Sequence, residues 1–335
     1  MGLAQERKII LVTRQTRLAG LRTKFATVSQ AKFYVEQAAL QERDRRRRED
    51  PNDTTQSLAD VSSTFSLYAD EDEQYHDAVT AVTRDISDLA KVQTVDRAFV
   101  PNLIFGPRDV VVIIGQDGLV ANTAKYALGL PLVAINPDPA RIDGVLLPFG
   151  VAQARSAVAK ALAGTAHVRE VTLAEATANN GQSLLAFNDF FVGAKSHVSA
   201  RYAIEHVGHQ ERQSSSGVLI STGAGSTGWL SSIFNMAMGL GGLAANPVEV
   251  VKPPTATWED KRLFFVVREP FISKTSQAHL VSGVISPGSE LTLESQMAED
   301  GVIFSDGVES DFLEFDSGTI IRIRAARKQA KLVVA

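Results

Sequence analysis

The chain has 335 residues, of which 44% are apolar and 21% charged, so it can bury a core and is not disordered as a whole. Its formal net charge is -4, whereas a protein whose main partner is a nucleic acid or an anionic membrane is usually basic. The absence of cysteine excludes disulfides and thiol catalysis and fits a reducing, cytoplasmic location, and no apolar run approaches the roughly 20 residues that span a bilayer.

The first half of the chain alternates short apolar runs with helical patterns. The continuous β-branched run at 110–114 is typical of a parallel strand covered on both faces. The other expected elements are strands at 9–12 and 132–135 and helices at 29–42, 77–89 and 152–162. This alternation predicts an α/β domain with a parallel sheet over residues 1–149.

A charged insert near 42–60 interrupts this domain. Five arginines follow Glu42 within six residues, a density that would suit a phosphate or nucleic-acid contact. Acidic residues are interleaved with them, which favours a solvated helix end that runs into a loop. We therefore expect no nucleic-acid partner.

The second half, residues 150–318, is expected to be a β-rich substrate-binding domain. Its predicted strands are 168–173, 184–192, 201–207, 218–221, 263–267, 279–285, 290–293 and 320–323, with one helix at 226–238. Residues 319–335 are expected to pack back on the first domain.

The segment Gly115–Gly118 directly follows the 110–114 strand and precedes a helix expected at 120–126. Such a junction lies at the carboxyl edge of a parallel sheet, where α/β ligand sites form. The glycines and the helix N-terminus would admit phosphate, and Asp117 could bind Mg²⁺ or take a proton from a hydroxyl. A simple Asp-Gly turn is the alternative.

Two further segments carry polar groups in apolar surroundings. Ser221–Gly228 follows a strand, opens a helix and could form an anion nest; it also matches a dinucleotide-binding fingerprint, though outside a βαβ unit. Asn188 and Asp189 interrupt an apolar strand, and buried polar groups need partners. A ligand ribose or amide would supply them; a bulge or turn is equally compatible.

Together these segments resemble the NAD kinases, which carry a Gly-Gly-Asp-Gly-Thr loop, an Asn-Glu pair and a Thr-x-x-Gly-Ser-Thr segment in this order. The matches are Gly115–Leu119, Asn188–Asp189 and Thr222–Thr227. The segment 134–148 is similar to the mitochondrial-type branch of that family, and the resemblance runs from about residue 8 to 334.

The resemblance implies a two-domain NAD kinase-like fold, with the active site in the cleft between the domains. ATP, with Mg²⁺, would give its terminal phosphoryl group to the 2′-hydroxyl of NAD, forming NADP. Asp117 would orient or deprotonate that hydroxyl. The other implied site residues are Gly115 and Gly118 at phosphate, Asn188 and Asp189 at NAD, and Thr222, Gly225, Ser226 and Thr227 along the nucleotide cleft. Homo-oligomerisation is implied by the resemblance alone.

Three residues depart from the family pattern. Gln116 stands in place of a glycine, Leu119 in place of a threonine and Asp189 in place of a glutamate. If position 116 needs a positive φ, glutamine there costs on the order of 1 kcal/mol. These changes keep two alternatives open: a related kinase with a sugar, lipid or nucleoside acceptor, and a non-catalytic NAD- or NADP-binding sensor.

The remaining polar residues predict no further site. The six histidines are expected at the surface, with His206 and His209 flanking a hairpin turn. The acidic residues at 306–316 are expected on an exposed strand face and in turns. Lys125 and Arg201 could contact phosphate, but an exposed surface position is favoured for both.

Overall fold

The computed structural model describes residues 7–25, 27–49, 58–242 and 252–335. It divides into two compact units. Unit 1 comprises residues 1–119, 133–166 and 335, and unit 2 comprises residues 120–132 and 167–334. The domain ranges drawn from the sequence, 1–149, 150–318 and 319–335, stay predictions.

Unit 1 contains the parallel sheet that the sequence predicts. β1 (Lys8–Thr13) pairs in parallel with β2 (Lys91–Asp96) on one side and with β3 (Val110–Ile114) on the other. The order continues as β4-β3-β1-β2, with β4 (Pro131–Asn136) also paired to the short β5 (Phe149–Gly150). All five residues of β3 are buried, as expected for a strand covered on both faces.

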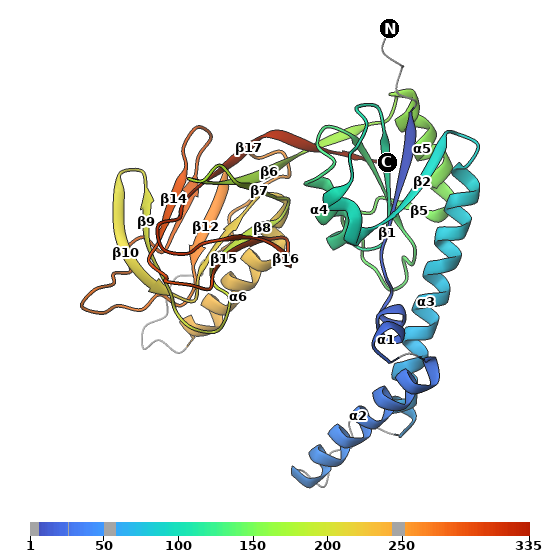
Figure 1. Ribbon diagram of the computed structural model, residues 1–335, viewed down its shortest axis with the longest axis horizontal. Helices are drawn as coiled ribbons and strands as arrows, with labels where there is room; N and C mark the ends of the chain where they lie inside the picture. Colours follow the sequence, from blue (N-terminus) through green and yellow to red (C-terminus); the bar gives the residue numbers. More distant parts are fainter. Residues whose placement is uncertain (1–6, 26, 50–57, 243–251) are drawn as a thin grey trace. The chain divides into compact units, whose positions relative to one another are not determined.

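The helices that lie wholly in unit 1 are α1 (Arg17–Phe25), α2 (Val28–Glu49), α3 (Leu58–Ile86) and α5 (Ala154–Ala163) (Figure 1). Of these, α2 and α3 are longer than the sequence patterns indicate, α5 nearly matches its expected range, and α1 was not predicted. In α3, Ala78, Val82 and Ile86 are buried at helical spacing, as expected, but the helix ends before Leu89, where the sequence pattern placed its end.

The arginine run is part of α2, so the expected helix end at residue 42 is wrong. Glu42 accepts hydrogen bonds from Arg45 and Arg46 one turn further along the helix. These hydrogen bonds lower the pKa of Glu42 to about 2. Such pairs three and four residues apart support a solvated helix. The expected loop at 51–57 lies outside the described residues.

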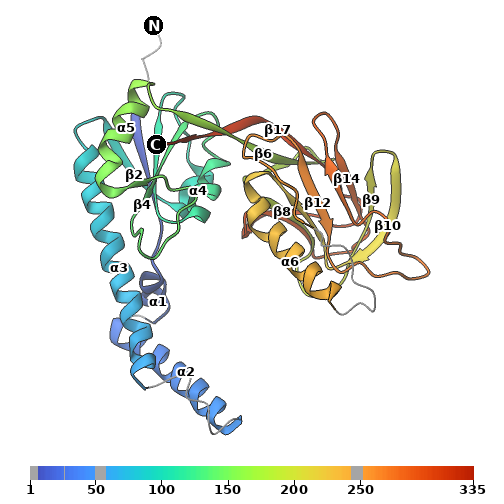
Figure 2. The same cartoon turned by 180° about the vertical axis from the view of Figure 1, so that it is seen from behind.

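Unit 2 is β-rich, as expected, and its strands form two sheets (Figure 2). The first has the order β13-β12-β11-β8-β15-β16; the second contains β10-β9-β14-β17, with β6 on β17 and β7 on β6. The strands are β6 (Val168–Ala178), β7 (Ser183–Ala186), β8 (Asp189–Ala194), β9 (Ala200–His206), β10 (His209–Ser215), β11 (Val218–Ser221), β12 (Leu263–Val267), β13 (Ser282–Ile285), β14 (Leu291–Ser295), β15 (Gly301–Ser305), β16 (Val308–Glu314) and β17 (Ile320–Val333).

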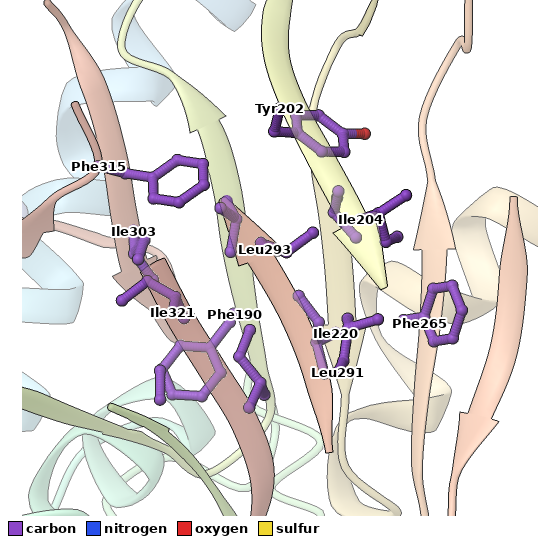
Figure 3. Packing of buried hydrophobic residues seen from close by; sticks show 14 of the residues in the cluster. Phe190, Tyr202, Ile204, Ile220, Phe265, Leu291, Leu293, Ile303, Phe315 and Ile321 are labelled. Atoms are coloured by element: carbon purple, nitrogen blue, oxygen red, sulfur yellow. The ribbon is translucent and has the colours of Figure 1, made fainter. Parts of the chain in front are cut away.

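The core of unit 2 lies between these two sheets, as Figure 3 shows. Phe190 and Ile220 of the first sheet face Leu291 of the second. Alternate residues point the other way. On that outer face Leu219 packs against Leu230 of α6 (Trp229–Gly241), so both faces of β11 are covered.

Candidate functional site

The loop after β3 is shaped by its small first residue. Gly115 is buried, and its N–H donates to the carbonyl of Ile135 at 3.3 Å. A Cβ at this position would lie 2.8 Å from Cδ2 of Leu119. Leu119 is 3% exposed and therefore covers Gly115, which explains an apolar side chain at this position.

Gln116 carries no backbone strain. The described non-glycine residues with positive φ are Val207, Glu269, Asp300 and Asp306, and Gln116 is not one of them. The cost considered for a positive φ at position 116 therefore does not arise. The Gln116 side chain is exposed, and its carbonyl accepts a hydrogen bond from the N–H of Leu119 at 2.8 Å.

Asp117 is the first residue of α4 (Asp117–Ala124), which begins three residues before the expected start. Its half-buried carboxylate accepts a hydrogen bond from the N–H of Leu146 through Oδ1, at 2.6 Å. Within the described ranges Oδ2 has no hydrogen bond. One oxygen is thus anchored, and the other remains able to accept a proton or bind a cation.

Asn188 and Asp189 lie where the chain leaves one sheet for the other. The expected strand 184–192 is in fact two strands, β7 and β8, which belong to different sheets. Asn188 is half-buried between them, and Asp189 begins β8. The polar pair therefore marks a bend, as one of the two readings from the sequence has it.

This bend is held by Asp306, a residue expected on an exposed strand face or in a turn. The Asp306 carboxylate accepts hydrogen bonds from three consecutive N–H groups, those of Phe187 (3.0 Å), Asn188 (2.6 Å) and Asp189 (3.4 Å). Asp306 has φ 54° in the turn between β15 and β16 and donates its own N–H to the carbonyl of Asp189 at 3.0 Å. The only sequence signal for this role was the Asp-Gly turn.

The side chain of Asp189 is 8% exposed. Burial, together with the nearby charge of Asp306, raises the pKa of Asp189 to about 7. In the part of the chain that the structure describes, its carboxylate makes no hydrogen bond or ion pair. A buried carboxyl group without a protein partner, with a pKa near neutrality, is a candidate ligand-binding group.

The segment after β11 packs directly on this bend. The Thr222 N–H donates to the Asn188 carbonyl at 2.9 Å, and the Thr222 hydroxyl donates to the Phe187 carbonyl at 2.6 Å. A Cβ at Gly225 would overlap the carbonyl oxygen of Asn188. The structure thus brings Asn188, Asp189, Thr222 and Gly225 together within unit 2.

The remaining residues of this segment differ in exposure. The Ser226 hydroxyl is buried and donates to the Gly223 carbonyl at 2.7 Å, whereas Thr227 is exposed. A Cβ at Gly223 would overlap the carbonyl oxygen of Thr257, so this glycine also serves close backbone packing. β11 is antiparallel to both of its neighbours, so the dinucleotide-binding fingerprint is not placed in a βαβ unit.

Lys125 is buried, so its expected surface position is wrong. It is 4% exposed, and its ammonium donates to the Ser305 hydroxyl at 2.6 Å and lies 3.3 Å from Oδ2 of Asp311. The positive charge also lowers the pKa of Asp306, against the stronger effect of burial, which raises it. Arg201 is exposed, as expected.

The histidines form no metal site in the described ranges, where no group of three or more His, Asp or Glu side chains could hold an ion. His206 and His209 flank the predicted hairpin turn, with Val207 and Gly208 at positive φ. His206 is nevertheless buried, against the surface position expected, and contacts Phe265 edge-on. No described helix is long and apolar enough to cross a membrane.

Neither a family model nor a curated protein matches this chain. Among solved structures, yeast NADH kinase complexed with NADH aligns with a TM-score of 0.55 at 13% identity, covering 99% of this chain and 84% of the yeast chain. An NAD kinase from Archaeoglobus fulgidus in complex with ATP aligns with a TM-score of 0.51 at 17% identity, covering 76% and 88%. The chain has the NAD kinase fold. The fold class predicted from the sequence is therefore confirmed.

Proposed function

We propose that this protein is a kinase that transfers the terminal phosphoryl group of ATP to the 2′-hydroxyl of NAD, giving NADP. Two proteins of the same fold were solved with NADH and with ATP. The observation that carries the proposal is the Asp117 carboxylate, which the Leu146 N–H fixes where β3 gives way to α4. This edge of a parallel sheet is where α/β proteins bind nucleotides.

In this proposal Asp117 orients the 2′-hydroxyl and accepts its proton. The 2′-oxygen forms a bond to the terminal phosphorus as the bond from that phosphorus to the bridging oxygen of ADP breaks. Such transfer depends on in-line positioning and charge neutralisation, with little covalent work for the protein. Gly118, with nothing within 4 Å of where a Cβ would lie, leaves room for phosphate at the backbone of the loop, whereas the space beside Gly115 is filled by Leu119.

The residues around Asp117 fit a Mg²⁺ ion that is held mainly by substrate. Mg²⁺ at phosphates takes one or two carboxylates and keeps several waters. Asp117 supplies such a carboxylate, and no group of three or more acidic or histidine side chains among the described residues could hold the ion by itself. When bound, the ion would neutralise charge on the phosphates.

In unit 2 we assign NAD recognition to the bend at 187–189 and the segment after β11. Asp189, protonated below about pH 7, can donate a hydrogen bond and, ionised above it, can accept two. Asn188 and the exposed Thr227 offer further polar groups, while Thr222, Gly225 and Ser226 fix the backbone shape through their internal contacts.

The test is NADP formation by the purified full-length protein with ATP, Mg²⁺ and NAD. We expect turnover, and loss of at least 100-fold in Asp117→Asn, because the amide cannot accept the proton. ATP consumption only with a sugar, lipid or nucleoside would reassign the acceptor. Tight NAD or NADP binding without turnover would indicate a sensor.

A further inference from the structure

A pocket of about 90 Å³ lies within unit 1 and shares only Gln116 with the candidate site described above. It is lined by three arginines, by Gln116 and Tyr75, and by residues of α3 and of the loop after β4. The arginines are Arg14, Arg17 and Arg141. Pockets that enclose a whole drug-sized ligand measure roughly 300–1,000 Å³, so this smaller space suits a small polar group rather than a nucleoside.

The pocket occupies the switch point of the parallel sheet. From β1 the chain forms β2 on one side and then β3 and β4 on the other. Arg14 directly follows β1, Gln116 follows β3 and Arg141 lies beyond β4. Ligands of open α/β sheets bind at the carboxyl ends of the strands at this point.

The base of the pocket is rigid. The Tyr75 side chain is 3% exposed, accepts a hydrogen bond from the Arg14 N–H at 2.8 Å and donates one to the Ile114 carbonyl at 3.1 Å. One tyrosine thus links the ends of β1 and β3. The Arg14 guanidinium lies over its ring at 5.0 Å.

The arginines keep unused donors. Glu71 accepts from Arg14 at 2.8 Å and from Arg17 Nε at 2.6 Å; although burial raises the pKa of Glu71, these hydrogen bonds lower it on balance. Arg14 Nε is buried and has no acceptor among the described residues. Arg141 lies 3.7 Å from Asp138 and 3.9 Å from Asp70, beyond hydrogen-bond reach.

We propose that this pocket binds the phosphate chain of the phosphoryl donor, with Arg17 and Arg141 as the main contacts and the Gln116 amide as a third. The pocket is lined by three positively charged guanidinium groups and by two carboxylates, those of Glu71 and Asp138, so its net charge is positive. Planar guanidinium groups suit phosphate oxygens because they donate in pairs. Gln116 directly precedes Asp117 in the chain, so one residue that lines the pocket belongs to the same loop as the proposed catalytic carboxylate. The identification of the ligand as the donor rests on the proposed function.

The test measures binding of inorganic tripolyphosphate, ATP and AMP to the full-length protein by calorimetry. We expect Arg141→Gln and Arg17→Gln each to raise the Kd for tripolyphosphate and for ATP about tenfold, with AMP affected far less. Both side chains are substantially exposed, so both variants should fold, which far-UV circular dichroism checks. Lysine variants, which keep the charge but not the fork, should recover part of the affinity.

The matched control is Arg155→Gln, which removes the same charge from unit 1 at an exposed arginine that does not line the pocket. Tripolyphosphate affinities that are equal in Arg141→Gln, Arg17→Gln and this control would overturn the pocket. If NADP forms while the KM for ATP in Arg141→Gln equals that of the control, the pocket assignment fails and the proposed function stands. If the protein shows no kinase activity but tripolyphosphate binding depends on Arg141, the proposed function fails and the pocket stands as a phosphate-binding site.

Discussion

Replacing Asp189 by asparagine should stabilise unit 2 at neutral and alkaline pH. Folding raises the pKa of Asp189 from 3.8 to about 7, chiefly by burial and further by Asp306. A shift of about three pKa units corresponds to roughly 4 kcal/mol of free energy of unfolding. Asparagine has the same shape and no charge, so the variant avoids this cost.

The pH dependence follows from the direction of the shift. Below pH 3.8 the carboxyl is protonated in both the folded and unfolded states and affects neither. Between pH 3.8 and about 7 only the folded state keeps the proton, so stability of the wild type falls as pH rises. Above pH 7 the full cost is present. The gain from Asp189→Asn should therefore grow from near zero at pH 3.5 to about 4 kcal/mol at pH 8.

Urea unfolding, followed by tryptophan fluorescence, measures the gain in the free energy of unfolding of unit 2. The chain has two tryptophans, Trp229 and Trp258, and both belong to unit 2, as does Asp189. Asp300→Asn, at an exposed aspartate of the same unit, is the control and should show no comparable pH dependence. A stability difference that stays flat from pH 3.5 to 8, or a loss at pH 8, would refute the reasoning. The same variant should weaken NAD binding, because a destabilising carboxylate is typical of a functional site.

Two other substitutions test the packing of unit 2. Gly225→Ala should cost about 1–3 kcal/mol in urea unfolding, because its Cβ would overlap the Asn188 carbonyl oxygen; Gly239→Ala, in α6 of the same unit and with nothing within 4 Å of the new Cβ, should not destabilise. Lys125→Met should cost about 1–3 kcal/mol by the same assay, because it removes the cation that faces Asp311; an unchanged midpoint would mean that the ion pair contributes nothing.

The sequence predicts the parts of the fold in which one pattern decides the structure. The β-branched run of β3 and the strand β11 have the predicted bounds, because both are buried on each face. The polar strand β10 escaped prediction, since it pairs with β9 alone and carries charged and amide side chains. The predicted α2 was too short, because the dense arginine run was interpreted as the end of the helix. In the structure the helix continues through this run, where Arg45 and Arg46 donate hydrogen bonds to Glu42.

The candidate site could be predicted only where residues near in sequence act together. The loop 115–118 and the segment 222–227 are local motifs, and both lie at strand ends as expected. Asp306 accepts hydrogen bonds from three residues that precede it by 117 to 119 positions in the sequence. Lys125 donates a hydrogen bond to Ser305, which follows it by 180 positions. Neither pairing leaves a trace in composition or periodicity, because both depend on which strands become neighbours.

The carboxylate of Asp306 has one more consequence. It fixes three successive amides of the bend at 187–189, yet it belongs to the hairpin of β15 and β16. The bend therefore depends on the hairpin: if residues 187–189 were grafted into another protein without it, their three amides would lose their common acceptor. Substitutions in the hairpin could therefore change the backbone at Asn188 and Asp189 while leaving both residues in place.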